Sequence, residues 1–99
     1  MELDEYAAWA ARVAKVSPGT MPDRERLAYL GLGLTGEAGE VAELIKKLLR
    51  DGTWSPDKLG DELGDVFYYL AALCTASGHR PGDILAASRA KIEARLQTL

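Results

Sequence analysis

The spacing of apolar residues between positions 22 and 50 constrains the fold of this chain more than any other feature. These residues recur three, four and seven positions apart, as on one face of a helix. They are Leu30, Leu34, Val41, Leu44, Ile45 and Leu48. The strict alternation that marks a half-buried strand occurs nowhere in the sequence. The pattern predicts a long amphipathic helix in an all-α protein.

Turn-forming and helix-capping residues divide the chain into four helical segments. The sequence SPGT favours a turn after the first segment, and Thr20 is a candidate cap for a helix that begins near Pro22. Gly52 suits the end of that helix, and Ser55 followed by proline suits the start of the next. The predicted helices span residues 2–16, 22–50, 56–76 and 81–97. We expect an all-α helical bundle in one domain, residues 1–99, because this length suits a single core.

Composition and charge exclude several classes of protein. The formal net charge of −3 argues against binding of a nucleic-acid polymer, which requires a basic surface. No apolar run reaches the roughly 18 residues that a membrane span needs, and the acidic start is unlike a signal peptide. The one cysteine, Cys74, excludes an intramolecular disulfide. We therefore expect a cytoplasmic protein that binds neither membranes nor nucleic-acid polymers, with Cys74 as a small buried side chain.

Two pairs of acids, each three residues apart, lie beside the apolar faces of adjacent predicted helices. On an ideal helix Glu37 falls in the middle of the apolar face, and Glu40 lies about 60° from it. Glu62 lies at the edge of the next apolar face, and Asp65 lies about 60° further out. A short connection makes the two helices antiparallel neighbours. The sequence therefore predicts that these four carboxylates converge.

Unpaired carboxylates near a core are costly, because burial and mutual repulsion both oppose ionisation. They must pair with basic side chains or bind a divalent cation, and oxygen ligands alone suit Mg²⁺ or Mn²⁺. The single histidine, His79, is not part of a Glu-x-x-His motif, which disfavours a di-iron site. Gly36, Gly39 and Gly64 next to the acids leave room for a ligand or for another backbone.

The stretches GLTGEAGEVAELIKKLLRDG and DELGDVFYYLAAL resemble the motifs of the MazG-like, all-α nucleoside triphosphate pyrophosphohydrolases. The resemblance covers about residues 26–95 and implies a helical bundle that forms a homodimer or a dimer of dimers. It also implies hydrolysis of a (d)NTP to the monophosphate and pyrophosphate with Mg²⁺, which Mn²⁺ could replace, in nucleotide-pool sanitation. By position, the metal ligands would be Glu37, Glu40, Glu62 and Asp65.

Candidates for catalysis and substrate binding accompany this resemblance. Tyr69, one turn after the second acidic motif, matches an aromatic that lies against the sugar or base in some members. The sequence WSP resembles the branch that prefers deoxycytidine nucleotides. Glu37 or Glu40 would take the proton of the attacking water. Basic side chains would offset the charge of pyrophosphate and tryptophans would stack on the base, the candidates being Lys47, Lys91, Arg95, Trp9 and Trp54.

The chain departs from the family pattern at two positions. Gly36 stands where many members carry a third acid, which leaves the identity of the general base open. Arg95 stands where an asparagine often follows the lysine that matches Lys91, so nucleotide contacts there would differ. Two other functions stay open: a non-catalytic, dimerising nucleotide sensor or interaction protein, and a phosphoribosyl-ATP pyrophosphohydrolase. The non-catalytic protein would neutralise its acids with lysine and arginine in place of metal.

Overall fold

The computed structural model describes residues 1–17 and 23–98, and within these ranges it contains four helices and no strand. The helices are α1 (Leu3–Ala14), α2 (Arg24–Asp51), α3 (Pro56–Ala76) and α4 (Pro81–Gln97). The all-α prediction is confirmed, and the last two helices have the predicted bounds. Thr20 and Pro22, predicted to begin the second helix, lie outside the described residues.

Local capping interactions explain where the first two helices end and begin. Helix α1 ends two residues earlier than predicted, because Lys15 adopts a left-handed conformation with φ of 59°. At the start of α2, the side chain of Asp23 accepts a hydrogen bond from the backbone N–H of Glu25 at 3.2 Å. Asp23 is therefore the N-cap of this helix.

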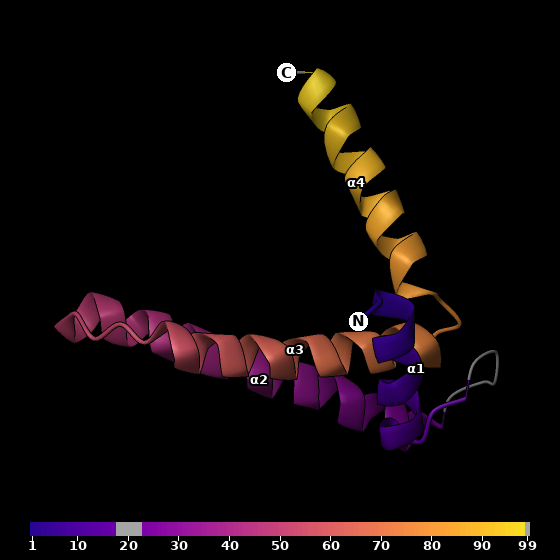
Figure 1. Ribbon diagram of the computed structural model, residues 1–99, viewed down its shortest axis with the longest axis horizontal. Helices are drawn as coiled ribbons and strands as arrows, with labels where there is room; N and C mark the ends of the chain where they lie inside the picture. Colours follow the sequence, from indigo (N-terminus) through magenta and orange to yellow (C-terminus); the bar gives the residue numbers. More distant parts are fainter. Residues whose placement is uncertain (18–22, 99) are drawn as a thin grey trace.

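Helices α2 and α3 form a long antiparallel hairpin, as the short connection predicts (Figure 1). Gly52 ends α2 with φ of 73°, a conformation that costs little only without a side chain. The hydroxyl of Ser55 accepts a hydrogen bond from the backbone N–H of Lys58, and Pro56 occupies the first position of α3. The turn therefore fixes the antiparallel pairing that brings the two acidic motifs together.

Helix α1 packs across the end of the hairpin far from the turn, whereas α4 projects away from it (Figure 1). The ion pair between Arg80 and Asp4, at 2.9 Å, joins the start of α4 to α1. None of the helices among the described residues is long and apolar enough to cross a membrane.

The core that these helices enclose is thin. It consists mostly of small side chains where α1 meets α3: Ala7, Ala10, Ala11, Ala14, Ala71, Ala72 and Ala76. Leu30 of α2 is the one large side chain among the described residues that is fully buried, with 1% of its surface exposed. Alanines let two helices approach closely, but they remove little apolar area from water.

The predicted apolar face of α3 divides into two. Leu73 packs against the cluster that contains Leu30, and Leu59 and Val66 are half-buried. Leu63 and Leu70 are exposed, as is Phe67 between them. The apolar residues of α4 are exposed as well, namely Ile84, Leu85, Ile92 and Leu96.

Candidate metal centre

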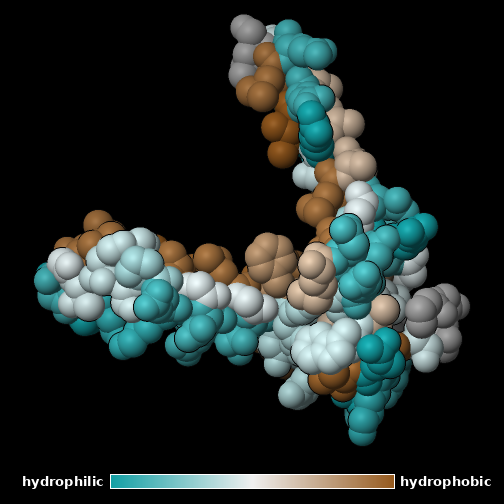
Figure 2. Space-filling view, in the orientation of Figure 1, coloured by the Kyte–Doolittle hydropathy of each residue, from teal (hydrophilic) through white to brown (hydrophobic). Residues whose placement is uncertain are grey.

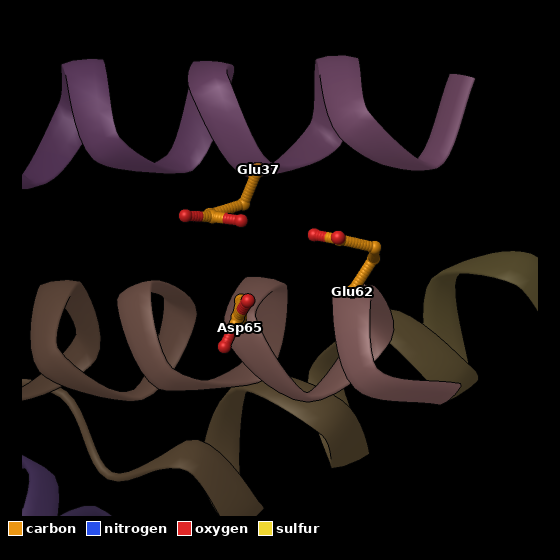
Figure 3. Close-up of side chains that lie close together, drawn as sticks. All are labelled: Glu37, Glu62 and Asp65. Carbon is orange, nitrogen blue, oxygen red and sulfur yellow. The ribbon is translucent and has the colours of Figure 1, made fainter. Parts of the chain in front are cut away.

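Three carboxylates converge in the space between α2 and α3. Glu37 comes from α2, and Glu62 and Asp65 come from α3 (Figure 3). One oxygen of each can be chosen so that all three lie within 4.8 Å of one another. The two α3 acids share a face because they are three residues apart. The antiparallel hairpin then places Glu37 opposite them.

No basic side chain among residues 1–17 and 23–98 forms an ion pair with these three acids. The ion pairs of these residues are Arg50–Asp51, Arg80–Asp4 and Arg89–Glu93. The pKa of Glu37 is raised above its ordinary value, first by its partial removal from water and then by the charges of Asp65 and Glu62. Hydrogen bonds to the same two carboxyls favour its protonated form further. The cluster therefore carries negative charge that the described residues do not neutralise.

The donor set of this cluster suits a hard divalent cation. All three ligands are carboxylates, which Mg²⁺ and Mn²⁺ prefer. The softer donors lie elsewhere: the Nδ1 of His79 is 2.9 Å from the hydroxyl of Ser77, after the end of α3. Cys74 lines a pocket with residues of α1 and α4. The residues present therefore fit Mg²⁺ better than zinc or iron.

Glu40, the fourth predicted ligand, lies outside this cluster. It is exposed on α2, one turn after Glu37, and it is not among the carboxylates that come within 4.8 Å of one another. Glu43, about 120° from Glu37 around an ideal helix, is also exposed. A ligand role for Glu40 therefore stays a prediction.

Tyr69 lies beside the cluster and packs directly over the backbone of α2. A Cβ atom on Gly33 would lie 2.7 Å from Cδ1 of Tyr69 and closer still to Cε1 and Cζ. Burial raises the pKa of Tyr69, and the neighbouring Tyr29 and Glu37 raise it further. Tyr69 was predicted near the site, but Gly33 was not, and its spacing of four from Glu37 was the available signal.

The glycines next to the acids do not serve close helix packing among residues 1–17 and 23–98. Apart from their own neighbouring backbone, added Cβ atoms at Gly36, Gly39 and Gly64 would meet nothing from these residues within 4 Å. We expected these glycines to leave room either for a ligand or for another backbone. The described structure agrees with room for a ligand, because no other helix approaches them there.

A row of aromatic rings leads from α1 to the cluster. The ring centroids of Trp9 and Tyr68 are 6.1 Å apart, and those of Tyr68 and Tyr69 are 5.1 Å apart. Tyr6 extends the row, with its ring 5.7 Å from Trp9. Trp9 is half-exposed and thus accessible to a ligand. Trp9 and Tyr69 were predicted from the sequence but Tyr68 was not, although the adjacent tyrosines of FYYL could have suggested it.

Comparison with known protein families agrees with this site. The model of the MazG nucleotide pyrophosphohydrolase domain matches residues 26–98, well over half of the chain. The chain belongs to the MazG family. It is also 41% identical over 80 residues to the Gene 37 protein of Mycobacterium phage L5, covering 74% of this chain and 69% of that protein. No solved structure matches the chain significantly.

The MazG match includes all of the predicted acids and excludes α1. It therefore supports a nucleotide pyrophosphohydrolase type of function for the hairpin and α4. Trp9 and Tyr6 lie outside the matched region, so the family match does not bear on their place in the aromatic row.

The remaining predicted substrate residues are not brought to the cluster within this MazG chain. Lys47 is ten residues beyond Glu37, about 15 Å along α2, where its charge helps to lower the pKa of Asp51. Trp54 is half-exposed in the connection at the far end of the hairpin (Figure 1). The other two, Lys91 and Arg95, are exposed on α4, which projects away from the hairpin.

Proposed function

We propose that this chain hydrolyses a nucleoside triphosphate to the monophosphate and pyrophosphate in a Mg²⁺-dependent reaction. In this proposal Glu37, Glu62 and Asp65 hold the cation, with Glu40 available as a further ligand. Mn²⁺ could replace Mg²⁺, because the ligands are oxygen atoms. The MazG family supports the type of reaction, and the proposal adds the bond that is cleaved and the residues that act.

One observation carries the proposal: three carboxylates meet between two helices without a basic partner among the described residues. The rival reading, a non-catalytic protein with salt-bridged acids, requires lysine or arginine at this place. A divalent cation offsets the same repulsion and also attracts phosphate.

The chain's own residues would then position the substrate and move one proton. When bound, Mg²⁺ supplies charge neutralisation of phosphate oxygens and lowers the pKa of a bound water. Water adds to the α-phosphorus, and the bond from that phosphorus to the α–β bridging oxygen breaks, so that pyrophosphate leaves. The proton of the water passes to a carboxylate, Glu37 or Glu40. We favour Glu40, because it lies one turn from Glu37 and is not one of the three converging carboxylates that would hold the cation.

Aromatic side chains would hold the nucleoside. Tyr69 lies next to Glu37, and the row through Tyr68 to Trp9 offers ring faces beside it. A base or sugar can stack there while the phosphates reach the acids. Trp54, and the basic side chains Lys47, Lys91 and Arg95, would contribute only if a second chain or a movement brought them near. The homodimer or homotetramer that the resemblance implies could supply such a second chain.

The reaction is tested by product analysis. The purified protein is incubated with Mg²⁺ and a panel of canonical and modified NTPs and dNTPs, alongside an Asp65→Asn variant. The proposal predicts monophosphate and pyrophosphate from wild type and no turnover from the variant, which should keep its helical circular dichroism. Diphosphate and phosphate as products would mean attack at a different phosphorus. No turnover of any nucleotide would instead favour phosphoribosyl-ATP as substrate or a sensor function.

A preferred substrate would also inform the cellular role. Selective cleavage of modified bases would agree with sanitation of the nucleotide pool, whereas a preference for deoxycytidine nucleotides would agree with the WSP sequence at Trp54.

A further inference from the structure

A hollow of about 450 Å³ lies between α1 and the connection that joins α3 to α4. Its apolar wall is formed by Ala7, Ala8 and Ala11, whereas Trp9 and Tyr6 lie on the other flank of the same helix. In Figure 2, hydrophilic side chains lie where α4 begins beside α1, and strongly apolar ones follow the edge of the hairpin and α4. We name this feature the α1 hollow, and its volume is within the range of small-molecule sites.

The rim of the α1 hollow is cationic, opposite in sign to the metal centre. Arg12, His79 and Arg80 line it, and Asp4 is the one acid among its lining residues in the described ranges. Asp4 is engaged by Arg80, with the two side chains 2.9 Å apart. Arg12 forms no ion pair with any other residue that the structure describes. Two arginines and one aspartate leave a net charge of +1 before His79 is counted, on a chain whose net charge is −3.

Two polar side chains of the α1 hollow have hydrogen-bonding capacity that the described residues do not use. Thr75 is only 9% exposed, and its hydroxyl takes part in none of the side-chain hydrogen bonds among these residues. The Nδ1 of His79 lies 2.9 Å from the hydroxyl of Ser77, which itself donates to the carbonyl of Leu73 at 2.8 Å. The hydroxyl therefore accepts from Nδ1–H, and Nε2 of His79 remains for a ligand.

The metal centre and the family match do not account for the α1 hollow. Thr75 is ten residues beyond Asp65 on α3, which places the two about 15 Å apart along the helix. The MazG match begins at residue 26, so the wall that α1 provides lies outside it. A cationic rim also repels the divalent cation that the three carboxylates would attract.

We infer that the α1 hollow is a second ligand site, which binds a phosphate monoester with a compact apolar or planar body. A phosphate monoester carries about −1.5 to −2 charges at neutral pH and offers three acceptor oxygens, more than a carboxylate does. Arg12 presents a planar guanidinium to these oxygens, and Arg80 keeps N–H donors beyond the one that Asp4 occupies. The hydroxyl of Thr75 supplies a further donor, and the alanines of α1 pack against the body of the ligand.

A ligand in this place would tie α1 to the connection between α3 and α4. The contact of α1 with α3 consists mainly of alanines, and the ion pair of Arg80 with Asp4 is exposed. A ligand that binds only the folded chain raises the midpoint of thermal unfolding. Because this effect requires no catalysis and no cation, it can be measured in EDTA, where the carboxylates of the metal centre repel phosphate.

The test is calorimetric titration of the full chain in EDTA with three probes: AMP, adenosine and inorganic phosphate. We expect saturable binding of AMP, and weaker binding of adenosine, which lacks the phosphate, and of inorganic phosphate, which lacks the body. Arg12→Gln should weaken AMP binding at least about 10-fold, and Thr75→Val at least about 3-fold. Arg89→Gln removes the same charge from the exposed surface of α4 and should change nothing.

Thermal unfolding and amide chemical shifts locate the ligand independently of these variants. AMP should raise the unfolding midpoint of wild type more than sodium chloride of equal ionic strength does, and it should shift the amide signals of Gly78 and His79. Absence of AMP binding in EDTA would overturn the proposal, as would equal affinity for AMP and either of the other probes. Affinity that survives Arg12→Gln but is lost in Trp9→Ala would place AMP at the aromatic row and overturn it too. None of these outcomes bears on the proposed reaction.

Discussion

Glu37 combines two properties that conflict unless a cation is bound. It lies half-buried between α2 and α3, and it faces the negative charges of Glu62 and Asp65. Both influences raise its pKa. Without metal, the folded protein therefore holds a proton on Glu37 more tightly than the unfolded chain does.

The raised pKa of Glu37 gives a defined pH dependence of stability. Its stabilising contribution is fully present below the ordinary pKa of 4.5 and is lost as pH rises through the raised value. In EDTA, as pH rises above 4.5, the midpoint of thermal unfolding should therefore fall more steeply in wild type than in Glu37→Gln. If the unfolding midpoints of the two proteins changed with pH in parallel, the neighbours of Glu37 would not be raising its pKa.

Glu40 differs from Glu37 in position and, in our account, in role. Glu40→Gln should lower kcat by at least about 100-fold if Glu40 accepts the proton of the water, while cation affinity changes little. The measurement is steady-state kinetics together with a metal titration. Glu43→Gln, an equally exposed change one turn further along α2, should leave both unchanged. A large loss of cation affinity in Glu40→Gln would make it a ligand instead.

At the scale of helices, the hairpin depends on close contact between Gly33 and Tyr69. The Tyr69 ring occupies the place where any side chain at position 33 would lie. Gly31 lies on the same helix two residues earlier, but a Cβ atom there would meet nothing within 4 Å. Both glycines therefore lower helix stability relative to alanine by a similar amount, but only Gly33 is in close contact with α3.

Gly33→Ala should destabilise the protein by about 1–3 kcal/mol, because the added methyl group displaces Tyr69. Gly31→Ala should instead stabilise it by up to about 1 kcal/mol through helix propensity. Chemical denaturation of both variants measures the difference. A Gly33→Ala protein as stable as Gly31→Ala would mean that Tyr69 does not pack on α2.

The helices were predictable because their signals are local. Ser55 and Pro56 mark the start of α3 and Gly52 marks the end of α2, so the antiparallel pairing of the acids followed from the sequence. The exposure of Glu40 and the contact at Gly33 depend on how the two helices rotate about their axes. That rotation is set by packing across the hairpin. The angular positions of residues on one ideal helix do not specify it.

At the scale of the whole molecule, α1 is held to the hairpin mainly by small side chains, with the rings of Tyr6 and Tyr68 packed beside them. Ala10 has no exposed surface and belongs to the cluster that joins α1 to α3. The direction of α4 is likewise a whole-molecule property, and no local signal predicted it. For this reason the sequence could not show that Lys91 and Arg95 lie away from the acids of their own chain.

Ala10→Leu should destabilise the protein by about 1–3 kcal/mol, because the larger side chain separates α1 from α3. Ala8→Leu, on the exposed side of the same helix, should change stability by no more than about 0.5 kcal/mol. Thermal and chemical unfolding of both variants provide the comparison. Equal stability of the two variants would mean that α1 is not packed as described.

The most direct test of the account is whether the three converging carboxylates bind a divalent cation. Mg²⁺ and Mn²⁺ are titrated calorimetrically into the full chain without nucleotide, with Asp65→Asn as the matched variant. We expect saturable binding to wild type that weakens at least about 10-fold in Asp65→Asn, since one of three carboxylate ligands is lost. Absence of binding to wild type, or equal affinity in both proteins, would contradict a metal centre at Glu37, Glu62 and Asp65.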